Sequence, residues 1–213
     1  MTDTAVNAEV QVLEELKPLS VGGEIQALIP RTYDEARSMA LGFCHAGIIP
    51  KGLTGKNDDE TLGMVTTAIM QGLEVGFGPV AAISNIMVVN GRPSIWGDGL
   101  IALIQASRQV EYFKEWIEGD ALTDDWTAYT EIKRKGQEEP YKGSFSWKQA
   151  QKARLTGKAG PWLSYPDRML QVRARSWAVR DGFADVLKGL SVVEEVQDLP
   201  KEKEEVETDF LDE

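Results

Sequence analysis

The segment 86–96 constrains the fold most strongly, because its sequence specifies a β-hairpin. Two short runs rich in apolar residues flank the dipeptide Asn90-Gly91. An Asn-Gly pair supplies the positive φ angles of a type I′ turn, the turn that joins two strands through two residues. In this register Val88 faces Pro93 as a non-hydrogen-bonded pair. The amide that Pro93 lacks would point away from the hairpin, so we expect the second strand to be a sheet edge at that residue.

Helical and extended patterns alternate irregularly around the hairpin. Thr32, Asp98 and Ser146 each precede apolar residues at helical spacing and are candidate N-caps. Runs of aromatic and β-branched residues between Gly and Pro punctuation indicate strands. We expect helices near 32–46, 57–75, 98–104, 146–154 and 166–181, a short turn over 80–84, and strands near 110–118, 126–135 and 141–146.

This order of elements predicts an α+β fold, a small antiparallel sheet with a β-hairpin, packed with helices. The 213 residues fit one domain over 31–193, preceded by a flexible lead-in over 1–30 and followed by a disordered acidic tail over 194–213. No apolar run is long enough to span a bilayer, and the first twenty residues do not resemble a secretory signal. A single cysteine, Cys44, and a single histidine, His45, fit a reducing cytoplasm and leave no zinc cluster.

The charge of the chain is unevenly distributed. The formal net charge is −11, yet residues 129–180 hold twelve Lys and Arg against four acids, a local balance of 12 − 4 = +8. Residues 194–213 hold two Lys against ten acids, a balance of 2 − 10 = −8. Clustered cations release counterions when they neutralise phosphates. The basic window therefore predicts a polyanionic partner, although a solvated face is the usual explanation of a charge run.

Aromatic residues interleave the basic window, a pattern typical of proteins that bind single-stranded nucleic acid, whose bases stack on flat side chains. Trp162 lies in a Gly/Pro loop and is the expected contact, whereas Trp177 shares a helical face with apolar residues and is expected in the core. In the last helix, Arg168 and Arg175 share one face while Arg173 and Arg180 share another, about 140° away. We expect one pair to contact nucleic acid and the other to meet a neighbouring subunit or to extend across the sheet.

Enzymatic functions find less support in the sequence. The Gly76-Phe77-Gly78 and Gly97-Asp98-Gly99 segments lack the spacing of nucleotide-binding loops. Cys44 and His45 are adjacent on a predicted helix, so they point about 100° apart and do not form a nucleophile pair. A Mg²⁺-dependent nuclease using acids such as Asp98, Glu74, Asp120 and Asp124 remains an alternative, as does a DNA-binding regulator, although no helix-turn-helix spacing is present.

The segment Asn85–Ser107, the three strands that follow, the Gly160-Pro161-Trp162 loop and the segment Tyr165–Leu190 together resemble the RecT/Redβ family of phage-type single-strand annealing recombinases. The resemblance covers roughly residues 30–190. It implies an ATP-independent protein, without a catalytic site, that binds single-stranded DNA in a basic groove. The positions that match the groove are Arg92, Lys148, Lys152, Arg154, Lys158, Trp162, Arg168, Arg173 and Arg175.

The resemblance also implies the partners of the protein. These are single-stranded DNA and annealing intermediates in homologous recombination, further copies of the chain in a ring or helical filament, and an exonuclease or host single-strand binding protein. No cofactor is implied, and Mg²⁺ would enter only with DNA, in the cytoplasm of a bacterium or phage-infected cell. This chain departs from the family at Gln171-Val172-Arg173, where relatives often have paired lysines. It also ends in a short acidic tail, which could compete with DNA, aid solubility or dock a partner through Phe210-Leu211.

Overall fold

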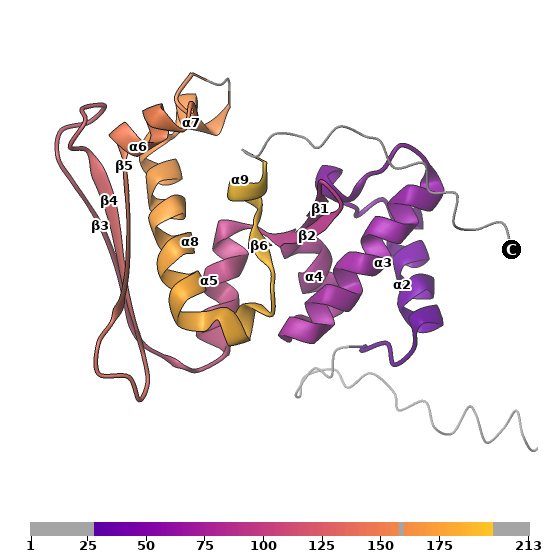
Figure 1. Ribbon diagram of the computed structural model, residues 1–213. Helices are drawn as coiled ribbons and strands as arrows, with labels where there is room; N and C mark the ends of the chain where they lie inside the picture. The colour runs from indigo at the N-terminus through magenta and orange to yellow at the C-terminus, as the bar shows by residue number, and fades with distance from the viewer. Residues whose placement is uncertain (1–27, 158–159, 198–213) are drawn as a thin grey trace, which may run out of the picture.

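The computed structural model describes residues 28–157 and 160–197, and Figure 1 shows their arrangement. The fold is α+β, as the sequence predicts, with helices packed on two three-stranded sheets. The described helices are α2 (Tyr33–His45), η1 (Lys51–Leu53), α3 (Asp58–Val75), α4 (Pro79–Asn85), α5 (Gly97–Ala106), α6 (Trp147–Lys152), α7 (Pro161–Ser164), α8 (Pro166–Leu187) and α9 (Val193–Val196). The strands are β1 (Ile86–Val89), β2 (Arg92–Ile95), β3 (Val110–Glu118), β4 (Thr127–Arg134), β5 (Tyr141–Ser146) and β6 (Ser191–Val192). The lead-in and most of the acidic tail lie outside the described residues.

The hairpin forms in the predicted register. β1 and β2 are antiparallel, with Val88 opposite Pro93, and the Asn90-Gly91 turn has φ values of +50° and +70°. β2 is nevertheless the middle strand of its sheet, because β6 joins its other side as a parallel partner of residues 94–95. This pairing begins one residue after Pro93. The edge predicted at Pro93 is therefore confirmed for that residue but does not extend along the strand.

The strands β3, β4 and β5 form a second, fully antiparallel sheet, and α8 crosses one of its faces (Figure 1). Ala128, Thr130 and Ile132 alternate along β4 and are buried on the side of α8. Gly143 of β5 permits this close packing, since a Cβ atom there would lie 2.0 Å from the carbonyl oxygen of Ala174. The opposite face of the sheet points away from the rest of the molecule (Figure 1).

Two hydrophobic cores result from this packing. The larger core joins α2, α3, α4, α5, the hairpin and the second half of α8. The smaller core, which we call the tryptophan core, joins β4, β5, α6, α7 and the first half of α8 around Trp126, Trp147 and Trp162. Helix α8 belongs to both cores, so it connects the two halves of the fold.

Helix α5 begins differently from the prediction. Its N-cap residue is Trp96, and Asp98 lies inside the first turn instead of capping the helix. The first amide of the helix, at Gly97, donates to Oε1 of Glu194 at 3.1 Å. The carboxylate of Glu194, distant in the chain, therefore accepts the free N–H at the N-terminus of the helix. Asp98 instead contacts arginines of α8.

The acidic tail begins later than the predicted boundary at residue 194. Val193 and Val196 are buried on either side of two glutamates in α9. The Glu195 carboxylate accepts a hydrogen bond from Ser176 Oγ at 2.8 Å and lies 2.9 Å from Arg180 Nη1. Residues 194–196 therefore belong to the folded part of the chain, because Val193 and Val196 are buried and the carboxylates of Glu194 and Glu195 accept hydrogen bonds from α5 and α8.

Candidate nucleic-acid interface

Helix α6 presents two lysines to solvent. It starts with the predicted capping box between Ser146 and Gln149, in which each side chain accepts the other residue's backbone N–H. Its apolar residues are buried, whereas Lys148 and Lys152 are one turn apart and exposed. Lys148 Nζ lies 3.4 Å from a carboxylate oxygen of Asp124. Both of these side chains are exposed, so the pair contributes little to stability.

Arg154 extends this basic surface just beyond the helix. Its backbone is left-handed, with φ at +57°, and its N–H donates to the Gln151 carbonyl at 2.9 Å. This conformation costs an L residue about 1–2 kcal/mol, while a cation at a helix C-terminus is favourable. The side chain is exposed. We call Lys148, Lys152 and Arg154 the α6 cations, since they place three exposed positive charges within seven residues.

Trp162, predicted as an exposed contact, is buried instead. Only 4% of its surface is accessible, and its ring lies 6.2 Å from that of Phe145 in the tryptophan core. Trp177 meets the same Phe145 ring edge-on at 5.3 Å, in agreement with its predicted packing role. The Gly/Pro loop suggested exposure, but its first turn forms α7 and directs the indole inward.

The residues on either side of this tryptophan are the exposed ones. Leu163 is 70% accessible and Tyr165 is 67% accessible. Both are close in the chain to Trp162, whose indole packs in the tryptophan core together with buried residues of α6. The exposed pair and the α6 cations therefore share one half of the fold. Nothing in the local sequence distinguishes Tyr165 from Trp162, since both lie in the same aromatic loop.

The arginines on the first face of α8, Arg168 and Arg175, bind carboxylates of the same chain. Arg175 is only 4% accessible, and its Nε and Nη2 donate to the two carboxylate oxygens of Glu115 at 2.8 and 2.7 Å. Asp98 accepts from Arg168 and also lies 3.5 Å from Arg175 Nη1. Burial by itself lowers the pKa of Arg175, but hydrogen bonds and charges from Glu115 and Asp98 outweigh it and raise the pKa. Arg175 is thus a buried structural cation, whereas Arg168 remains partly exposed beside its partner.

The second arginine face contacts α9 at the surface of the protein. Arg173 Nη2 donates to the Glu194 backbone carbonyl at 3.3 Å, and its guanidinium lies 5.9 Å from the centre of the Phe145 ring. Arg180 pairs with Glu195, as described above. Groups of the same chain therefore contact both arginine faces, while Arg168 and Arg180 keep 44% and 46% of their side chains exposed. The expectation that one face meets nucleic acid, and that the other meets a neighbouring subunit or extends across the sheet, stays a prediction.

Arg92 is separate from the α6 cations. Arg92 is exposed at the start of β2, on the hairpin that packs in the larger core. Lys158 lies outside the described residues. Of the nine predicted positions, the structure brings together Lys148, Lys152 and Arg154 as an exposed set, with Arg168 on the neighbouring first turn of α8.

The outer face of the β3–β5 sheet carries an aromatic surface that the sequence reasoning did not single out. The rings of Trp116 and Tyr129 stack across the strands, with centroids 5.3 Å apart and planes 13° from parallel. Tyr112 donates to Glu131 at 2.6 Å, which raises the pKa of Tyr112 to about 12. Period-2 alternation in β3 and β4 could have revealed this face. Its lysines and acids form neighbouring pairs, including Lys133–Glu111 and Lys142–Glu131, so it has no excess of cations.

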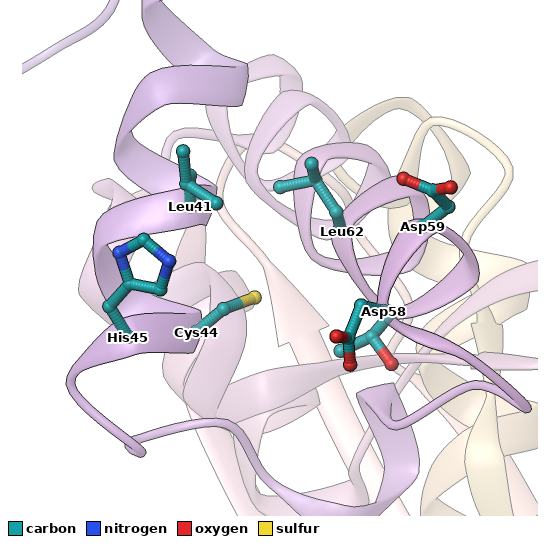
Figure 2. Close-up of a pocket in the computed structure, with 7 residues that line it drawn as sticks. Leu41, Cys44, His45, Asp58, Asp59 and Leu62 are labelled. Atoms are coloured by element: carbon teal, nitrogen blue, oxygen red, sulfur yellow. The ribbon is translucent and has the colours of Figure 1, made fainter.

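A pocket between α2 and α3 is lined by Leu41, Cys44, His45, Asp58, Asp59, Thr61 and Leu62, and its volume is about 320 Å³ (Figure 2). The imidazole of His45 and the thiol of Cys44 point in different directions, as their adjacency on a helix requires. Burial and the charge of Asp58 raise the pKa of the Cys44 thiol. The thiol is therefore a poor nucleophile.

No protein-family model matches the chain, and a comparison with curated proteins finds no relative. Within 28–157 and 160–197, no group of three or more His, Cys, Asp or Glu side chains could hold a metal ion. None of the helices in these ranges has the length and apolar character needed to cross a membrane. The site must therefore be interpreted from its own geometry.

Proposed function

We propose that the protein binds single-stranded DNA through the α6 cations and anneals complementary strands without nucleotide hydrolysis. One observation carries the proposal: three exposed cations lie on one short helix and on the residue that follows its C-cap. Among the described residues, neither Lys152 nor Arg154 forms an ion pair, and the pair of Lys148 with Asp124 is solvent-exposed. These charges are accessible to phosphates, unlike that of Arg175, which is 4% accessible.

Contacts to phosphates suit annealing in particular. Lysine and arginine neutralise the backbone of a strand and release its counterions without reading its sequence. Bases held by their backbone remain accessible for pairing with a second strand. The binding energy in this proposal comes from charge, so affinity should fall steeply as salt rises.

The resemblance to single-strand annealing recombinases supplies the rest of the proposal. It favours assembly as a ring or filament, a role in homologous recombination, and cooperation with an exonuclease or a host single-strand binding protein. The protein would act in the cytoplasm and need no cofactor, with Mg²⁺ entering only through DNA. A Mg²⁺-dependent nuclease would instead destroy labelled strands, and a regulator would prefer a defined duplex site.

The test is annealing of two complementary labelled oligonucleotides, followed by fluorescence, without ATP. The wild-type protein should accelerate pairing, and Lys152→Glu with Arg154→Glu should remove most of the acceleration and flatten the salt dependence of binding. Lys135→Glu is the matched control for a single reversal, because this exposed lysine lies in the β4–β5 turn, at the opposite end of those strands from α6. Acceleration only with ATP, strand loss with Mg²⁺, or an equal effect of Lys135→Glu would refute the proposal.

A further inference from the structure

Leu163 and Tyr165 form an apolar projection on the surface of the protein. Both are about two-thirds exposed or more, on α7 and its C-terminal cap. Burying an aromatic side chain removes about 150–250 Å² from water, so this pair gains substantially from a partner. The half of the fold that carries the pair has an excess of cations: Arg168 follows in the first turn of α8 beside one acid, Asp167, and the α6 cations lie on a helix of the same core.

The pocket between α2 and α3 has complementary properties. Leu41, Cys44 and Leu62 give it an apolar lining, while Asp58 and Asp59 contribute two carboxylates (Figure 2). Its volume of about 320 Å³ lies at the lower end of the range of ligand pockets, which suits one or two side chains. A tyrosine hydroxyl that is buried on binding needs a hydrogen-bond acceptor. The carboxylates of the pocket can accept this hydrogen bond, whereas its apolar side chains cannot.

We infer that the α2–α3 pocket of one molecule receives Leu163 and Tyr165 of a second copy of the chain. Leu41 and Leu62 of the pocket can cover the exposed pair, and the two carboxylates of the pocket are opposite in charge to the cations in the half of the fold that carries the projection, so charge complementarity favours this occupant over the acidic tail. The inference specifies surfaces for the assembly that is part of the proposed function. Its test uses protein without DNA, so a failure of the inferred contact can be distinguished from a failure of the proposed DNA annealing.

The positions of the two surfaces determine the kind of assembly. Figure 1 shows α7 on the side of the β3–β5 sheet, whereas α2 and α3 form the opposite side of the molecule. One molecule cannot bring these surfaces together within itself. A contact between two different surfaces of identical subunits is heterologous, and its repetition gives a ring or an open filament.

The test uses sedimentation velocity of the full chain over a wide range of protein concentration. The projection variant carries Leu163→Ser and Tyr165→Ser, and the pocket variant carries Leu41→Lys. Wild-type protein should form species larger than a dimer, and each variant alone should be monomeric. An equimolar mixture of the two variants should form a dimer and nothing larger, because the mixture retains one intact pocket and one intact projection. Leu122→Asn is the control, since it removes an exposed leucine from the β3–β4 turn.

Circular dichroism of each variant shows whether it is folded, and these surface substitutions should leave the spectrum unchanged. A wild-type protein that stays monomeric at every concentration would overturn the inference. So would a variant that still assembles alone, or a mixture that stays monomeric while the wild type assembles. If the projection variant assembles normally but loses affinity for single strands, Tyr165 stacks on bases and the pocket has a different partner.

Discussion

Replacement of Arg154 by glycine separates the charge of this residue from its structural role. Arg154 has φ at +57°, so glycine relieves a conformational cost of about 1–2 kcal/mol. The gain is offset by the greater freedom of glycine in the unfolded chain, about 0.4–1 kcal/mol, and by the lost cation at the end of α6, about 0.3–1 kcal/mol. These terms nearly cancel. The free energy of unfolding should therefore stay within about 1 kcal/mol of the wild-type value, a shift in Tm of roughly 2–4 °C at most.

Binding should respond differently, because the variant lacks one phosphate contact. The slope of log affinity against log salt for a single strand should become shallower by about 0.7, measured by fluorescence anisotropy with a labelled oligonucleotide. Arg108→Gly is a closely matched control: Arg108 is exposed, follows α5 and has φ at +58°. It should have the same small effect on Tm and no effect on the slope. A large fall in Tm for Arg154→Gly, or equal slopes for both variants, would refute the assignment.

Three further predictions concern residues that pack or pair inside the fold. Arg175→Ala should lower the free energy of unfolding by about 3 kcal/mol in chemical denaturation, the lower end for a broken buried ion pair, because Glu115, whose side chain is 15% exposed, loses its bidentate partner; a loss below about 1 kcal/mol would contradict the pairing. Gly143→Ala should cost roughly 1–3 kcal/mol by the same measurement, since the new methyl group meets the Ala174 carbonyl oxygen, and an unchanged midpoint would show that α8 packs more loosely. Burial raises the pKa of Glu194 in the folded protein, so the folded state binds more protons than the unfolded state between the ordinary pKa of 4.5 and the raised value. Wild-type stability should therefore fall as pH rises through this window, whereas Glu194→Gln should remove this fall; identical pH profiles of unfolding for both proteins would contradict it.

Local structure followed from the sequence wherever neighbouring residues decide it. The Asn90-Gly91 turn and the register of Val88 opposite Pro93 depend on backbone angles that only a few residue types adopt. The capping box of Ser146 depends on groups three residues apart. The strands β3, β4 and β5 followed from alternation and punctuation. The α+β class was predictable for the same reason, since it summarises the order of these elements.

Part of the candidate site was also predictable. Lys148 and Lys152 remain exposed because the buried side of α6 contains its apolar residues, a pattern readable at helical spacing. The excess of positive charge over residues 129–180 predicted the region of the chain that contains these exposed cations. It could not indicate which cations have acids beside them in space.

The partners of the α8 arginines depend on the tertiary structure alone. Arg175 meets Glu115 from sixty residues earlier in the chain, and Arg173 meets the backbone of Glu194, twenty-one residues later. The parallel pairing of β6 with β2 and the burial of Trp162 are likewise products of long-range packing. Local sequence fixes backbone angles and the faces of helices. Which distant acid neutralises a buried cation depends on where α8 lies between the sheet, α5 and α9, because a charge removed from water must find its partner in the folded protein.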